Sequence, residues 1–123
     1  MARPAELRRQ LLDYALAMPE AYLDHPWGED VVKVGKKVFA FFGMPEDSQY
    51  PFGMTVKLVE SQPLALAQPG VAPSGYNLGK AGWVSIRLTD QLPFEMLRDW
   101  IDESYRTIAP KRLSTQPVDQ PRS

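Results

Sequence analysis

The residues best suited to binding chemistry lie on two segments of alternating hydrophobicity, 53–58 and 83–88. In each segment one set of side chains is apolar and faces a core, so the residues between them must face away from it. Lys33, from an earlier segment, joins this outward set. Cations contact phosphates, and an aromatic ring can stack on a base. We therefore predict a nucleic-acid-binding face with an exposed tryptophan, formed by Lys33, Lys57, Trp83 and Arg87.

An ordinary solvated sheet face is the alternative interpretation of the same residues. Antiparallel sheets commonly cover a core with one face and expose the other, where Thr, Ser, Lys and Arg are expected. The large ring of Trp83 is the member of the set that this alternative explains least well.

The single histidine, His25, is a second candidate for chemistry. An imidazole can act as a base or as a metal ligand, but the chain has no cysteine and no second histidine to complete a nitrogen or sulfur site. We therefore expect His25 to pack or hydrogen-bond near Trp27. The acids between residues 20 and 30 could attract a hard cation, although they lack the spacing of a calcium loop. We predict no catalytic residue, no metal site and no cofactor. Catalysis by a pair of carboxylates remains an open hypothesis, because the distance between two side chains in space does not follow from their separation in sequence.

Composition places the chain among ordinary globular proteins. It has 123 residues, 44% hydrophobic and 24% charged, which suits one domain with one core. The net charge is −1, so the protein does not coat nucleic acid by bulk charge. The segment 31–88 is nevertheless basic, with six Lys or Arg against three acids. No apolar run approaches the roughly 20 residues of a membrane span, and we expect a monomeric, cytoplasmic protein that has no membrane contact.

The expected elements alternate between helices and strands. Apolar residues at helical spacing predict a first helix over 4–18, with Arg8 and Arg9 solvated. They also predict a last helix that Thr89 or Asp90 caps, with Pro93 near its start and its apolar face running to Ile108. Segments 31–34 and 37–42 predict a hairpin. Strands are expected at 53–58, 76–78 and 83–88, with a short helix at 61–67. Segments 19–30, 43–52 and 71–75 have the Pro, Gly and polar residues of loops.

This order predicts an α+β fold. Antiparallel strands with helices on one face form a two-layer sandwich. We expect one domain over residues 1–110 and a polar, mobile tail over 111–123.

Four segments occur in an order that is typical of one protein family. They are Asp24–Gly28 (DHPWG), Lys33–Ala40 (KVGKKVFA), Gly75–Ile86 (GYNLGK and WVSI) and Asp102–Tyr105 (DESY). With these segments the chain resembles the MmcQ/YjbR family of small bacterial proteins over about residues 4–113. The resemblance implies a CyaY-like, or frataxin-like, α+β fold and a DNA-binding function, with no established catalytic residues.

The leading functional hypothesis is therefore a non-enzymatic DNA-binding module. A protein-binding or small-ligand-binding adaptor that uses the same face or a cleft near Trp27 is the first alternative. A frataxin-like metal-handling protein is the second. Frataxin-like proteins bind iron through an acidic first helix, but here Glu6 and Asp13 are offset by Arg8 and Arg9 in the helix and by Arg3 just before it.

Overall fold

The computed structural model describes residues 4–25, 29–43, 53–75, 77–88 and 91–110. Helices and strands follow one another as α1 (Pro4–Leu16), β1 (Ala21–Asp24), β2 (Asp30–Val34), β3 (Lys37–Gly43), β4 (Gly53–Lys57), α2 (Gln62–Leu66), β5 (Val71–Pro73), α3 (Asn77–Lys80), β6 (Trp83–Arg87) and α4 (Phe94–Ile108).

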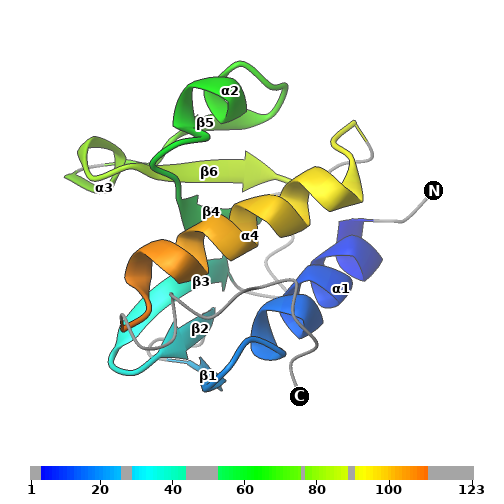
Figure 1. The fold of residues 1–123 in the computed structure, drawn as a ribbon. Coiled ribbons are helices and arrows are strands. Elements are labelled where there is room, and N and C mark those ends of the chain that lie inside the picture. Colours follow the sequence, from blue (N-terminus) through cyan, green and yellow to red (C-terminus); the bar gives the residue numbers. More distant parts are fainter. Residues whose placement is uncertain (1–3, 26–28, 44–52, 76, 89–90, 111–123) are drawn as a thin grey trace.

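The strands form one antiparallel sheet in the order β1-β2-β3-β4-β6-β5. The long helices α1 and α4 pack on one face of it, while α2 and α3 contact the β5–β6 end (Figure 1). The predicted α+β sandwich is therefore confirmed, and β1 and β5 are its edge strands.

A single apolar core fills the space between the sheet and the two long helices. Leu11 of α1 and Leu97 and Ile101 of α4 are fully buried against Val56 and Val84 of the central strands. These helix residues recur at the three- and four-residue spacing that places side chains on one face. The alternation of β4 and β6 sends their apolar residues into this core, as predicted.

Three local predictions about secondary structure are wrong. Segments 21–24 and 71–73 form the edge strands β1 and β5, although their surroundings have the composition of loops. Residues 77–80 form the short helix α3, whereas a strand was predicted at 76–78. Gly79 explains part of this, since a Cβ there would lie 2.5 Å from the Ser74 carbonyl oxygen, so only glycine allows the turn to pack so closely. Tyr76, the predicted loop residues 44–52 and the predicted tail 111–123 lie outside the described residues.

The segment Asp102–Tyr105 anchors α4 to four other parts of the chain. The hydroxyl of Tyr14 donates to Asp102 at 2.8 Å, which ties α4 to α1. The hydroxyl of Tyr105 donates to the Pro19 carbonyl at 2.7 Å, which ties it to the chain ahead of β1. Asp102–Tyr105, one of the four segments that resemble the family, thus serves to hold the fold together.

Ser104 enters the sheet itself. Its Oγ accepts from the Lys57 backbone N–H at 2.9 Å and donates to the Phe39 carbonyl at 2.6 Å. The register of β3 and β4 pairs Ala40 with Val56, so Phe39 and Lys57 come next, where a direct ladder bond would form. The buried Ser104 hydroxyl bridges the Lys57 N–H and the Phe39 carbonyl in place of that direct bond, and it holds the backbone at Lys57.

Glu103 holds the turn that leads into α2. One carboxylate oxygen accepts from the backbone N–H groups of Val59, Glu60 and Ser61, at 2.7–3.1 Å. The other accepts from the Ser61 hydroxyl at 2.6 Å. Burial raises the pKa of Glu103, but these hydrogen bonds lower it by more, so the pKa lies below its ordinary value.

Within the described ranges, no helix is both long and apolar enough to cross a bilayer.

Candidate nucleic-acid interface

The sheet face opposite α1 and α4 has its own pattern of side chains. One row crosses it from Val31 through Phe41 and Thr55 to Ser85, as the strand register dictates. The Thr55 and Ser85 hydroxyls lie 3.3 Å apart, and Ser85 lies 2.9 Å from the hydroxyl of Ser74. The predicted outward set of β4 and β6 therefore exists as a face, with hydroxyl groups in its centre.

Trp83 is on this face, but it is buried. It is 8% exposed, and its ring meets Phe41 edge to face with centroids 5.4 Å apart. The expectation of an exposed tryptophan is therefore wrong. The alternating pattern indicated the direction of the side chain correctly. It did not show that β3, which lies on the far side of β4, supplies a second ring on the same face that covers apolar area. Stacking of Trp83 on a base would require this contact to open.

Lys57 lies beside Trp83 as its cross-strand partner. Its backbone is held from inside by Ser104, as described above. On the other side, Gly82 has a positive φ of 101°, and a Cβ there would lie 2.9 Å from the Leu58 carbonyl oxygen and 3.7 Å from the Lys57 side chain. The stem of Lys57 is half-buried. The backbone and the stem that carry the Lys57 ammonium group are therefore held in place.

Lys33 has an acidic partner on this face. Its ammonium group lies 3.1 Å from a carboxylate oxygen of Asp24 on the neighbouring strand β1. The backbone N–H of His25 and then the Lys33 ammonium lower the pKa of Asp24. Part of the Lys33 charge is thus neutralised before any ligand arrives.

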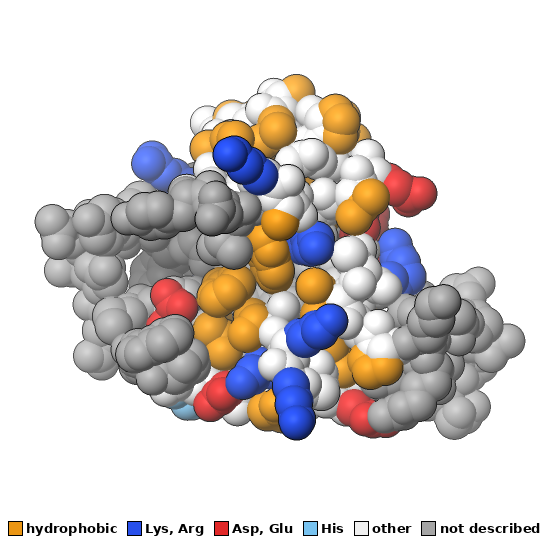
Figure 2. All heavy atoms as spheres, turned by 90° about the vertical axis from the view of Figure 1, so that its left-hand side faces the viewer, with side chains coloured by type: hydrophobic (Ala, Val, Ile, Leu, Met, Phe, Trp, Pro, Cys, Tyr) orange, Lys and Arg blue, Asp and Glu red, His pale blue; other side chains and the backbone are white. Residues whose placement is uncertain are grey.

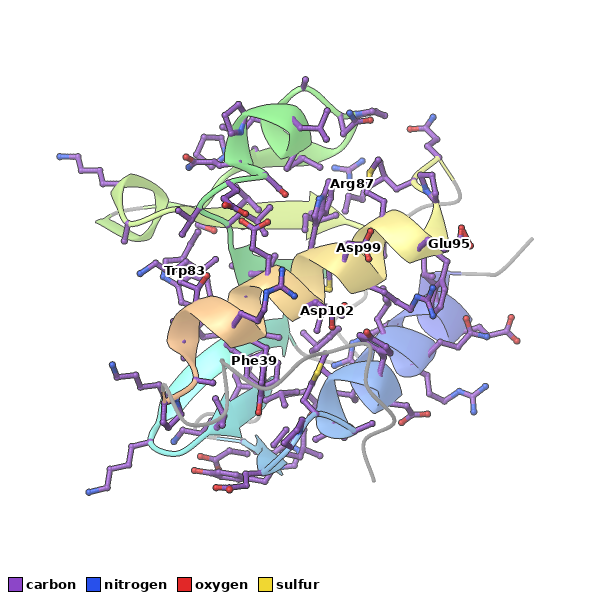
Figure 3. All side chains as sticks on the ribbon, viewed as in Figure 1. Phe39, Trp83, Arg87, Glu95, Asp99 and Asp102 are labelled. Atoms are coloured by element: carbon purple, nitrogen blue, oxygen red, sulfur yellow. The ribbon has the colours of Figure 1, made fainter. Side chains whose placement is uncertain are left out.

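Arg87 is exposed at the far end of β6 from Trp83 (Figure 3). Four residues of extended chain separate the two, which is about 13 Å. Arg87 pairs with Gly53, whereas Trp83 pairs with Lys57. The four predicted residues therefore share a face, but they do not form one contiguous group.

One end of the sheet gathers lysines that the sequence pattern did not single out. Lys36 lies in the turn between β2 and β3, and Lys37 begins β3; both are exposed. Helix α3 brings the exposed Lys80 to the start of β6. Through the Ser104 hydroxyl, the backbone at Lys57 is linked to that of Phe39, two residues after Lys37. We call this group the lysine end: Lys33, Lys36, Lys37, Lys57 and Lys80.

The lysine end is a coherent basic surface. Figure 2 looks onto this side of the molecule and shows Lys and Arg side chains grouped around a smaller apolar patch. Within the part of the chain that the structure describes, Lys33 is the only one of the five that forms an ion pair. The basic excess of segment 31–88 was the signal in the sequence. The topology that collects it at one end was not visible there.

His25 belongs to a separate cluster at the opposite end of β2. Its Nε2 lies 2.9 Å from one carboxylate oxygen of Asp30, and Arg8 lies 2.6 Å from the other. Arg8 also donates to the carbonyls of Phe42 and Gly43 at 3.1 Å. Arg8 is 7% exposed, so the prediction that it is solvated is wrong. Trp27, the expected neighbour of His25, lies outside the described residues.

The acidic residues of this region are used in pairing. Asp24 contacts Lys33, and Asp30 contacts Arg8 and His25. Across the described ranges, no three His, Cys, Asp or Glu side chains come together in a way that could hold a metal ion.

Comparison with known proteins gives one family match and several similar solved structures, including the following two. The family model described as YjbR matches residues 16–107. The Deinococcus radiodurans protein DR2400, described as a DUF419 domain, is 24% identical with a TM-score of 0.72, covering 94% of this chain and 87% of that one. A protein from Pseudomonas syringae is 22% identical with a TM-score of 0.65, covering 82% and 97%. Both support the fold. No curated protein matches the chain.

Proposed function

The chain belongs to the YjbR family, and from the lysine end we propose that it is a cytoplasmic DNA-binding protein that acts without catalysis. The observation that carries this proposal is the cluster of Lys36, Lys37, Lys57 and Lys80, which have no acidic partner among the described side chains. Unpaired lysines attract phosphates, and their release of condensed counterions drives binding to DNA.

The roles of the predicted residues follow from their positions. Lys57 contacts a phosphate from a fixed backbone, and Lys33 contributes less because Asp24 shares its charge. Trp83 supports Lys57 by packing against Phe41. Arg87 lies outside the lysine end and serves as the matched control.

Binding without catalysis is supported by the surroundings of His25. Its imidazole bonds to the carboxylate of Asp30, and in the described portion of the chain no hydroxyl nucleophile bonds to it. A nucleophile within hydrogen-bond reach of a base is the signature of covalent catalysis.

The test is titration of a fluorescent DNA duplex at several salt concentrations. Four phosphate contacts predict a slope of log K against log salt of about −3.6, from about −0.9 per contact. The double variant Lys37→Ala/Lys57→Ala should reduce the slope to about −1.8. Arg87→Ala, which removes one exposed cation elsewhere on the same face, should leave the slope unchanged.

Two results would contradict the proposal. The first is no binding at low salt. The second is a slope that falls equally for Arg87→Ala and for a single lysine variant, because general charge would then explain the binding.

A further inference from the structure

We propose that the DNA bound at the lysine end is single-stranded, and that one of its unpaired bases stacks on the ring of Phe41. The inference rests on the proposed function, because the lysines supply the phosphate contacts, and it deepens that function by naming the form of DNA. We call the surface that receives the base the stacking face: Phe41, Thr55, Trp83 and Ser85.

The first observation is an accessible aromatic ring beside the lysines. Phe41 of β3 is half-buried, and its ring meets that of Trp83 edge to face at 5.4 Å. Trp83 is itself too deeply buried to stack, but it is the cross-strand partner of Lys57 and holds the Phe41 ring next to that lysine. Figure 2 shows an apolar patch that adjoins the lysines on this side of the molecule. Every base has a π-face, so a ring that a neighbour already holds in place offers a stacking platform.

The second observation is a pair of hydroxyl groups that adjoin this ring. Thr55 is the cross-strand partner of Phe41, and Ser85 is the partner of Thr55 on its other side. Their oxygens lie 3.3 Å apart, and Ser85 is exposed. A hydroxyl has one donor and two acceptor positions, so the pair retains hydrogen-bonding capacity. A purely apolar partner would cover these groups without bonding to them, whereas a base combines a flat ring with polar edges.

The spacing of the ring and the nearest cation fits one nucleotide. Lys57 follows Thr55 by two residues on β4, so Phe41 and Lys57 are diagonal cross-strand neighbours, about 7–8 Å apart. A base and its phosphate are joined through a single sugar. One nucleotide can therefore place its base on Phe41 and its phosphate at Lys57.

The width of the sheet distinguishes a single strand from a duplex. Phe41 lies on β3, inside a sheet of six strands. At about 4.8 Å per strand this sheet is about 24 Å wide, which is about twice the width of the major groove of B-DNA. The interior of such a face does not enter a groove, and the bases of a duplex are stacked on one another. A duplex therefore meets the lysines alone, whereas a single strand meets the lysines and the ring.

The test is fluorescence anisotropy with three ligands of about 12 nucleotides each, a length within the usual range of single-strand sites. They are an oligothymidine strand, an abasic strand that has the same phosphates without bases, and a duplex. The wild type should bind oligothymidine about tenfold more tightly than the abasic strand, which is in the lower part of the range for base–aromatic stacking because Phe41 is half-buried. Phe41→Leu should lose this preference. Its affinity for the abasic strand and for the duplex should be unchanged, which also shows that it is folded.

The matched control is Phe94→Leu. Phe94 is also half-buried, but it lies on α4, which packs on the opposite face of the sheet. This variant should keep the tenfold preference. A readout that needs no variant is irradiation of the wild type with a strand that carries 5-iodouracil, which should cross-link to the peptide that contains Phe41.

The outcomes separate this inference from the proposed function. Equal wild-type affinity for oligothymidine and the abasic strand would overturn the inference and leave DNA binding at the lysine end standing. So would a preference that Phe41→Leu retains, or a cross-link to a peptide outside the stacking face. Absence of binding to all three ligands at low salt would overturn both.

Discussion

Replacement of Glu103 by glutamine tests how α4 holds the rest of the fold. The change keeps the shape of the side chain and removes its charge. The amide oxygen can still face the three backbone N–H groups, and the Ser61 hydroxyl can turn to accept from the amide nitrogen. The variant should therefore fold with the same architecture and lower stability.

The expected cost comes from the three N–H donors. A hydrogen bond to a charged group contributes about 1 kcal/mol more than a neutral one, and three such bonds would give about 3 kcal/mol. The turn is partly exposed to water, which reduces the difference to about 2 kcal/mol. For a domain of this size, this predicts a fall in melting temperature of roughly 6–12 °C.

The pH dependence gives a second, independent readout. The pKa of Glu103 in the folded protein is below its ordinary value of 4.5, so ionisation of Glu103 stabilises the fold. That contribution is fully present above pH 4.5 and is lost as the pH falls through the folded pKa. The stability difference between wild type and Glu103→Gln should therefore be largest at neutral pH and should narrow below pH 4.5.

Urea denaturation of wild type, Glu103→Gln and Glu95→Gln from pH 3 to 7 measures this difference. Glu95 is exposed on the same helix, so its variant makes the same chemical change without these hydrogen bonds. Because Glu95 lies in the first turn of α4, loss of its charge at the helix N-terminus should change stability by at most about 1 kcal/mol. Equal stability of Glu103→Gln and wild type at pH 7 would refute the reasoning. A difference that stays constant down to pH 3 would refute the assignment to charge.

Three further predictions concern other parts of the fold. Burial, and then the hydrogen bond to the Asp102 carboxylate, raises the pKa of Tyr14 to about 12. An ultraviolet titration of Tyr14→Phe should therefore lack one tyrosine that ionises late in the wild type. Wild-type stability should also fall as the pH rises above 10, because the unfolded chain loses the tyrosine proton first. Asp30→Ala should lower the free energy of unfolding by about 3–5 kcal/mol, because it leaves the buried Arg8 without its carboxylate partner. The double variant Arg8→Leu/Asp30→Leu should recover much of that stability, and urea denaturation of the double-mutant cycle measures both changes. Gly79→Ala should cost about 2 kcal/mol or more, because its Cβ would overlap a carbonyl oxygen, whereas Gly75→Ala meets nothing within 4 Å and should be close to neutral in the same thermal melts.

Hydrophobic periodicity was sufficient to predict the main elements of this fold. The strand at 83–88 corresponds to β6 to within a residue at each end, and the last helix ends at Ile108 as predicted, although it begins at Phe94 rather than directly after Thr89 or Asp90. Both carry a clear period of two or of about 3.6 residues along their whole length. The two edge strands are too short to show a period, and they pair only because β2 and β6 offer free edges.

The candidate site was harder to predict because it depends on contacts between distant segments. Lys33, Lys57, Trp83 and Arg87 do share the predicted face. The burial of Trp83 depends on Phe41, whose ring reaches it across β4 from β3. Burial of Arg8 depends in the same way on Asp30 and on carbonyl groups of β3. Local pattern gives the direction of a side chain, but it does not give its neighbours.

The hydroxyl of Ser104 has a consequence for how the chain folds during synthesis. It completes the junction between β3 and β4, and it follows all six strands in the sequence. Until the ribosome has made Ser104, the Lys57 N–H and the Phe39 carbonyl at the centre of the nascent sheet lack their relay. The link between β3 and β4 through Ser104 can therefore form only after α4 has been synthesised. A growing chain that stalls before α4 exposes an incomplete sheet to other chains and to chaperones.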